Sequence, residues 1–162
     1  MHYTVTTQGH RRFDVYDDAG RLVGTMAQNT WRPLRAEITV GDTIYRAAPT
    51  GFWQTTMVIT RNDSPFAEIK FSMRTGLKIN FTSEGSPYYF RYKGFWHTTY
   101  TVKDDYGNEI GLLQTHFNWK RWKYDYEIKV HPNNLAAEAN HVLPLLMMYC
   151  LRYTRVLQSG TV

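Results

Sequence analysis

The residues best able to do chemistry in this chain are its histidines, its one cysteine and two acidic pairs. The histidines are His2, His10, His97, His116, His131 and His141. None of them forms a pair at helical ligand spacing, and no cysteine partners them as zinc ligands. Cys150 lies within an apolar stretch, where a thiol is usually inert. The chain also lacks a Gly-x-Ser-x-Gly elbow and a phosphate-binding glycine loop. We therefore expect no catalytic residue, no metal site, no cofactor and no enzyme activity.

The acidic pairs lie in two similar motifs, Asp17-Asp18-Ala19-Gly20 and Asp104-Asp105-Tyr106-Gly107. Paired carboxylates can bind calcium or carry out acid–base chemistry. Ordinary hairpin turns use the same residues, since aspartate accepts backbone amides and glycine adopts positive φ. The pattern favours turns.

An internal repeat indicates which elements must position these residues. Gly51-Phe52-Trp53-Gln54-Thr55-Thr56 returns 43 residues later as Gly94-Phe95-Trp96-His97-Thr98-Thr99. A fixed period of this length usually means that one supersecondary unit has been copied. Similar β-branched and aromatic runs begin at positions 13, 57 and 100, and each ends in turn residues. They predict the first strand of three units.

Further alternating runs complete the units. Second strands are predicted at 22–26, 66–73 and 110–115, third strands at 36–40, 77–81 and 124–130, and fourth strands at 43–47 and 88–92. The third unit lacks a fourth strand, and the N-terminal run 3–7 can take that place and close the ring. We expect a mainly β fold, a twelve-stranded antiparallel barrel built from three four-strand repeats.

The tail, 133–158, has helical spacing, and its apolar stretch 142–151 is far shorter than the roughly 20 residues that cross a bilayer. A barrel of this width leaves a lumen that a hydrophobic C-terminal helix can fill. Pro144 implies that the regular helix starts near Leu143 or bends there. Glu138 and His141 share a helix face and form either a polar site at the barrel mouth or a cap on the helix entry.

With these turns and this helix, the chain resembles the tubby C-terminal-like superfamily, which includes phospholipid scramblases and LURP-one-related proteins. The resemblance covers the whole chain and implies a barrel wrapped around a C-terminal helix. It also implies membrane association, through an anionic membrane surface or a phosphoinositide-like headgroup. Scramblases are less similar, because they carry a membrane-inserting segment near the end.

Composition agrees with one domain over 1–162, with 43% hydrophobic residues and a net charge of +5. The first residues lack the pattern of a secretory signal, and a single cysteine cannot form an internal disulfide. We expect a cytoplasmic protein, peripheral at a membrane if the resemblance holds.

The two barrel ends should differ in charge. In an up-and-down barrel, the connections 9–12, 29–35, 49–53, 73–78, 93–97 and 118–123 lie at one end. They carry all five tryptophans, Trp31, Trp53, Trp96, Trp119 and Trp122, and no Asp or Glu. Their cations are Arg11, Arg12, Arg32, Arg35, Arg74, Lys78, Lys93, Lys120, Arg121 and Lys123. Arg152 and Arg155 should emerge from the helix at the same end, which we call the basic end. The opposite turns are net negative.

Indole prefers the headgroup layer, and cations are drawn to anionic lipid, so the basic end predicts a lipid-binding site. Its candidate residues are Trp119, Lys120, Arg121, Trp122, Lys123, Trp31, Arg32, Arg35, Arg74 and Lys78. Alternatively, Trp119 and Trp122 fold back over the barrel mouth while the cations are merely solvated. For Trp53 and Trp96 the repeat itself favours a packing role.

Three other functions remain open. One is a structural or protein-interaction barrel without lipid activity. Nucleic-acid binding through stacked indoles ranks lower, because the cations follow a ring and a single strand needs a continuous groove. A lipid-carrying barrel is disfavoured, since the helix would occupy the lumen.

Overall fold

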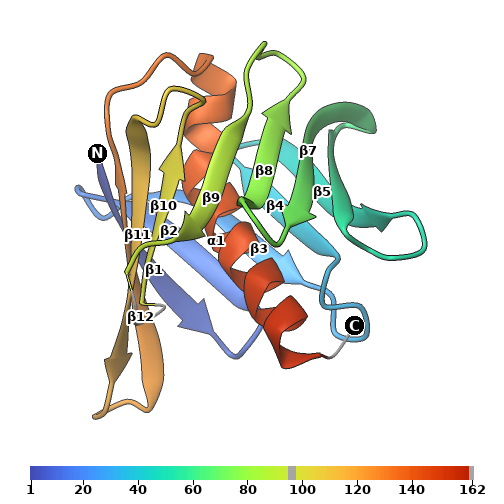
Figure 1. Ribbon diagram of the computed structural model, residues 1–162. Helices are drawn as coiled ribbons and strands as arrows, with labels where there is room; N and C mark the ends of the chain where they lie inside the picture. The colour runs from blue at the N-terminus through green and yellow to red at the C-terminus, as the bar shows by residue number, and fades with distance from the viewer. Residues whose placement is uncertain (95–97, 161–162) are drawn as a thin grey trace.

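The computed structural model, which describes residues 1–94 and 98–160, is a closed antiparallel β-barrel with one helix through it (Figure 1). The strands are β1 (His2–Gln8), β2 (Arg12–Asp17), β3 (Leu22–Gln28), β4 (Ala36–Val40), β5 (Thr43–Thr50), β6 (Thr56–Arg61), β7 (Ser64–Ser72), β8 (Gly76–Phe81), β9 (Tyr88–Tyr92), β10 (Thr99–Lys103), β11 (Glu109–Asn118) and β12 (Lys123–Val130). Helix α1 (Ala137–Ser159) follows them. The expected strand count and enclosed helix are confirmed.

Each strand pairs with its sequence neighbours, and β1 closes the ring between β2 and β12. Tyr3 lies opposite Ile128 on β12, and Val5 lies opposite Val15 on β2. The N-terminal run therefore supplies the strand that the third repeat lacks, as the pattern predicts. This order also places the described residues of the six connections named above at one end of the barrel.

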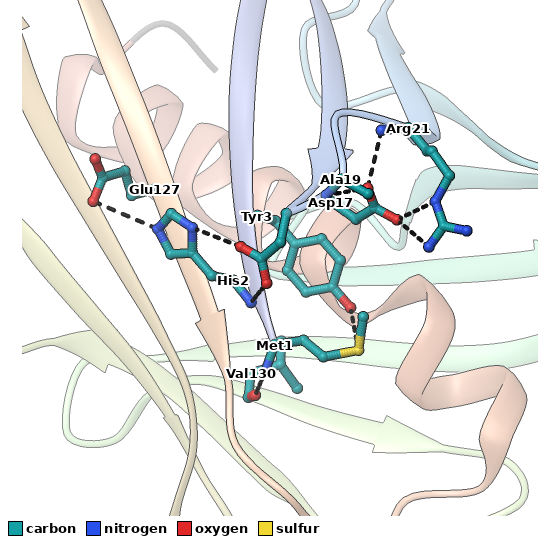
Figure 2. A network of polar contacts seen from close by, with 9 residues as sticks. Met1, His2, Tyr3, Asp17, Ala19, Arg21, Glu127 and Val130 are labelled. Atoms are coloured by element: carbon teal, nitrogen blue, oxygen red, sulfur yellow. Dashed lines mark hydrogen bonds and ion pairs between the residues drawn. The ribbon is translucent and has the colours of Figure 1, made fainter.

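Polar contacts close the seam beside β1 (Figure 2). The N-terminal ammonium donates to the Val130 carbonyl at 2.7 Å. The His2 ring lies between Asp18, with Nδ1 3.3 Å from a carboxylate oxygen, and Glu127, with Nε2 3.7 Å away. These groups are partly exposed, so the hydrophobic core below them contributes more to closure.

The repeat has a structural counterpart in the wall that faces the helix. In every unit, a β-branched residue of the first strand pairs with a glycine or alanine of the second, and a β-bulge follows directly. These pairs are Val15 with Gly24, Ile59 with Ala67, and Val102 with Gly111. The small residues leave room for α1, because Leu145 lies against Gly24 and Met147 against Gly111.

Helix α1 is buried around most of its circumference, over Ala139, 142–151 and Tyr153. It begins at Ala137 and includes Pro144, so its regular part does not start near Leu143. Cys150 is fully buried, and burial raises the pKa of its thiol well above the usual range. A thiol held in its neutral form is a poor nucleophile.

The helix enters at the acidic end, where Glu138 joins it to the wall. Arg61 Nε lies 2.7 Å from a Glu138 oxygen, and the Tyr45 hydroxyl donates to the same carboxylate at 3.0 Å. Burial, and then this bond, raises the pKa of Tyr45 to about 12. Glu138 thus anchors the N-terminal end of the helix to the barrel wall, while His141 is exposed beside it.

Candidate functional site

The basic end gathers the tips of the hairpins and the C-terminal turns of α1 (Figure 1). Two buried helix hydroxyls join the helix to these tips. Tyr149 donates to the Leu34 carbonyl at 2.7 Å, in the β3–β4 connection. Tyr153 donates to the Gln54 carbonyl at 2.9 Å, between β5 and β6. The helix therefore fixes two of the loops that carry tryptophan.

The described tryptophans of the basic end are exposed rather than packed. Trp31 is 90% exposed, Trp53 80%, Trp119 72% and Trp122 76%. Trp119 and Trp122 therefore do not fold back over the barrel mouth, and the packing role favoured for Trp53 is wrong. Trp96 lies outside the described residues. Large apolar side chains left in water at one end of a barrel need an explanation, and binding to another surface is the usual one.

The β11–β12 hairpin holds the first group of candidate residues and extends beyond the rim in Figure 1. Asn118 fixes its loop, since its side-chain oxygen accepts the amides of Lys120 at 3.2 Å and Arg121 at 3.3 Å. Trp122 has φ of 51°, a left-handed conformation that is strained for a bulky side chain. Around the loop, Phe117 contacts both indoles edge-on, with ring centroids 4.7 Å from Trp119 and 6.0 Å from Trp122. The result is an aromatic tip on a loop that Asn118 caps.

The β3–β4 connection, 29–35, uses the same local chemistry to present Trp31. The Asn29 side-chain oxygen accepts the amides of Trp31 and Arg32, both at 3.0 Å. Its last residue, Arg35, donates its amide to the Arg32 carbonyl at 2.9 Å. Asparagine at the base of a tight connection is thus a local signal that the sequence carries twice.

The third group, Arg74 and Lys78, belongs to the β7–β8 hairpin together with the exposed Met73. A cleft of about 730 Å³ lies beside it, lined by Phe71, Leu77 and the helix residue Leu157 among others. In the ring of strands, the β3–β4, β7–β8 and β11–β12 tips are four strands apart. The candidate residues therefore form three separate cationic tips around one rim, not one continuous patch.

Three of the ten cations expected at the basic end pair with carboxylates, which corrects the count of free charges. Arg12 pairs with the buried Asp14, and Arg121 with Asp125 at 3.2 Å. Lys93 reaches along the wall to Glu109 at 3.1 Å. The other seven make no ion pair with any described residue: Arg11, Arg32, Arg35, Arg74, Lys78, Lys120 and Lys123.

The acidic motifs at the opposite end are turns. Asp17 accepts the amides of Ala19 and Arg21 on one oxygen, at 3.0 and 2.9 Å, and the Arg21 guanidinium on the other. Asp104 accepts the amides of Tyr106 and Asn108 in the same way. Hydrogen bonds from Arg21 lower the pKa of Asp17. N–H donors so placed disfavour a bound cation, and 1–94 and 98–160 contain no cluster of acidic, histidine or cysteine residues suited to a metal ion.

Sequence reasoning missed two contributions to this end. Phe52 is exposed beside Trp53, with ring centroids 5.3 Å apart, and adds to the aromatic surface. The positioning role of Tyr149 and Tyr153 was also missed. Two tyrosines four residues apart in an otherwise apolar helix are a visible signal, because a buried phenol needs a hydrogen-bond partner.

Comparison with known proteins supports the fold alone. No protein-family model and no curated protein sequence matches the chain. The X-ray structure of a protein from Arabidopsis thaliana is similar, with a TM-score of 0.63 and 14% identity, over 95% of this chain and 90% of that one. Within the described residues, α1 is too short in its apolar part to cross a membrane.

Proposed function

We propose that this protein is a non-enzymatic binding module that associates peripherally with anionic phospholipid through its basic end. The observation that carries the proposal is the exposure of Trp31, Trp53, Trp119 and Trp122 at the end where seven cations lie without an ion pair to any described residue. An exposed indole lowers the solubility of a protein in water, whereas at a membrane it lies favourably in the headgroup layer. Cations near an anionic surface contribute about 1 kcal/mol each.

The arrangement of the tips favours a flat, extended ligand over a narrow one. Three tips spaced four strands apart around a barrel rim offer separate contacts at one end of the barrel, which suits an extended surface. A single nucleic-acid strand would meet only one of them at a time. A protein partner remains the alternative, and the test below distinguishes it.

The proposal also covers the family of the protein and its location in the cell. We propose a tubby-like barrel of the LURP-one-related kind, acting in the cytoplasm, where the facing membrane leaflet is anionic. The shared architecture of barrel and internal helix supports this membership. Phosphoinositide-like headgroups are candidate lipids.

The test is co-sedimentation with vesicles of phosphatidylcholine, with and without phosphatidylserine. The double variant Lys120→Gln, Lys123→Gln removes two unpaired cations of the β11–β12 tip. At about 1 kcal/mol per cation, affinity for the anionic vesicles should fall by about 2 kcal/mol, or roughly 30-fold. The variant Trp119→Ala, Trp122→Ala should weaken binding by a similar order.

Lys129→Gln is the matched control, because Lys129 is exposed on β12 but lies toward the acidic end, opposite His2. It should bind like the unmodified protein. Absence of binding to anionic vesicles, or equal binding to neutral ones, would refute the lipid proposal and leave a protein partner as the better explanation.

A further inference from the structure

A pocket of about 460 Å³ opens at the basic end, between the β1–β2 turn, the β11–β12 hairpin and the last turns of α1. Its lining includes Thr7, His10, Lys123, Tyr126, Arg152 and Arg155. These residues come from four separate elements of the fold. The rest of the lining is largely aromatic, with Phe13, Phe117 and Trp122 among it, so the three cations and the hydroxyl groups are the part of the pocket that can bind an anion.

The two arginines are held in place by aromatic rings and amides rather than by carboxylates. Arg155 donates to the Tyr126 hydroxyl at 3.2 Å and lies over the Tyr124 ring, 4.9 Å from its centroid. Arg152 donates from Nε to the Gln28 side chain at 2.9 Å and lies 5.4 Å from the Phe13 centroid. Arg155 also interacts with the Tyr100 hydroxyl, and neither guanidinium uses its remaining N–H donors in an ion pair with a described residue.

The positive charge in this pocket is uncompensated. No described carboxylate forms an ion pair with Arg152 or Arg155. Burial lowers the pKa of Arg152, and repulsion from Arg155 and Arg11 lowers it further. Partly buried charges are normally paired, because leaving water is costly. The partial negative charge at the end of α1 opposes an anion, but it is confined to the last turn, beyond Arg155.

Thr7 gives an independent indication. Its hydroxyl is buried and has no hydrogen-bond partner, and among the described residues it is the sole buried side-chain oxygen or nitrogen in that state. It lines the same pocket as the arginines. Buried polar groups nearly always have partners, so an unpaired one needs an explanation. Because the Thr7 oxygen has almost no accessible surface, its hydroxyl can donate to an anion oxygen only after a neighbouring side chain of the pocket moves aside.

We propose that this pocket binds a phosphate group, with Arg152, Arg155 and Lys123 neutralising its charge and Thr7 donating a hydrogen bond. Guanidinium groups recognise phosphate well, because their planar donors match two oxygens at once. The phosphate belongs either to a lipid headgroup or to a soluble phosphorylated compound. In the first case the inference rests on the membrane binding proposed above, and in the second it stands without it.

The soluble arm measures the rise in melting temperature with inorganic phosphate and glycerol 3-phosphate, at constant ionic strength against chloride. Arg155→Gln should weaken phosphate binding by about tenfold or more, since charge-assisted hydrogen bonds are strong. Thr7→Val is the sharper variant, because it removes a hydroxyl that has no partner in the fold. It should leave the unliganded protein as stable as before and still weaken phosphate binding. Lys129→Gln serves as the control.

The vesicle arm compares phosphatidic acid, which exposes a phosphomonoester, with phosphatidylserine at matched surface charge. Arg155→Gln and Thr7→Val should reduce binding to phosphatidic acid selectively. Arg74→Gln, which lies outside the pocket, should reduce binding to both lipids alike. Soluble binding without vesicle binding would support the pocket and refute the membrane proposal.

The phosphate site is overturned if neither soluble phosphate nor phosphatidic acid responds to Arg155→Gln and Thr7→Val differently from Arg74→Gln. Charge-dependent vesicle binding in that case would still support the membrane proposal. A loss of binding by Arg155→Gln alone, together with a lower melting temperature, would also count against the site, because Thr7→Val tests it without disturbing packing.

Discussion

Replacing Gly24 by alanine should reveal how closely the barrel fits its helix. A Cβ at this position would lie 2.5 Å from the Thr39 carbonyl oxygen and 2.9 Å from a methyl carbon of Leu145. The first contact is to backbone in β4, which the ladder between β3 and β4 holds in place. The strand or the helix must move. Overpacking of a core costs about 1–3 kcal/mol, and a backbone clash belongs at the upper limit, about 3 kcal/mol.

Gly111→Ala is the matched control, since Gly111 occupies the same place in the third repeat. Its Cβ would meet the sulfur of Met147 at 2.9 Å and the methyl carbon at 3.1 Å, both at the end of a flexible side chain. Methionine can adopt another rotamer, so the cost should be about 1 kcal/mol or less. Alanine also reduces the entropy of the unfolded chain, which offsets part of that cost.

The assay is thermal and urea denaturation of both variants. For a chain of this size, about 1 kcal/mol corresponds to roughly 2–4 °C in Tm. Gly24→Ala should therefore melt roughly 6–12 °C lower than the unmodified protein, and Gly111→Ala within about 4 °C of it. If Gly24→Ala melts no lower than Gly111→Ala, the backbone contact is not limiting and the reasoning fails.

Two further predictions concern buried tyrosine hydroxyls of the helix and of the barrel wall. Tyr149→Phe should lower the free energy of unfolding by about 1–3 kcal/mol in urea denaturation, because it leaves the Leu34 carbonyl without its 2.7 Å partner. Tyr3→Phe is the control and should cost less, since the Tyr3 hydroxyl has only a 3.6 Å contact with the Met1 sulfur. Burial raises the pKa of Tyr45 and Tyr153 to about 12, above the unfolded value of about 10, so the stability they add is complete below about pH 10 and is lost as the pH rises through 12. Tyrosinate absorbance and circular dichroism should change together in that range, and unfolding that is complete below about pH 10 would contradict the assignment.

The local pattern of the sequence was sufficient to predict the barrel and the difference in charge between its two ends. Alternation and turn residues mark each strand, and the 43-residue repeat from Gly51 to Gly94 sets their number. Both glycines have positive φ, 76° and 85°, which explains why the repeat retains them. Because consecutive antiparallel strands alternate in direction, the basic connections had to share one end.

Only the tertiary structure decided how the side chains at that end are used. The repeat favoured packing for Trp53, but the indole of Trp53 lies in water, because a shared backbone pattern does not fix the surroundings of a side chain. Lys93 finds its partner Glu109 two strands away in the ring, a pairing that depends on register and side-chain reach. The pocket of Arg152, Arg155 and Thr7 joins the two ends of the chain, so no sequence window contains it. Secondary structure follows from neighbours in sequence, whereas exposure, ion pairing and pockets follow from neighbours in space.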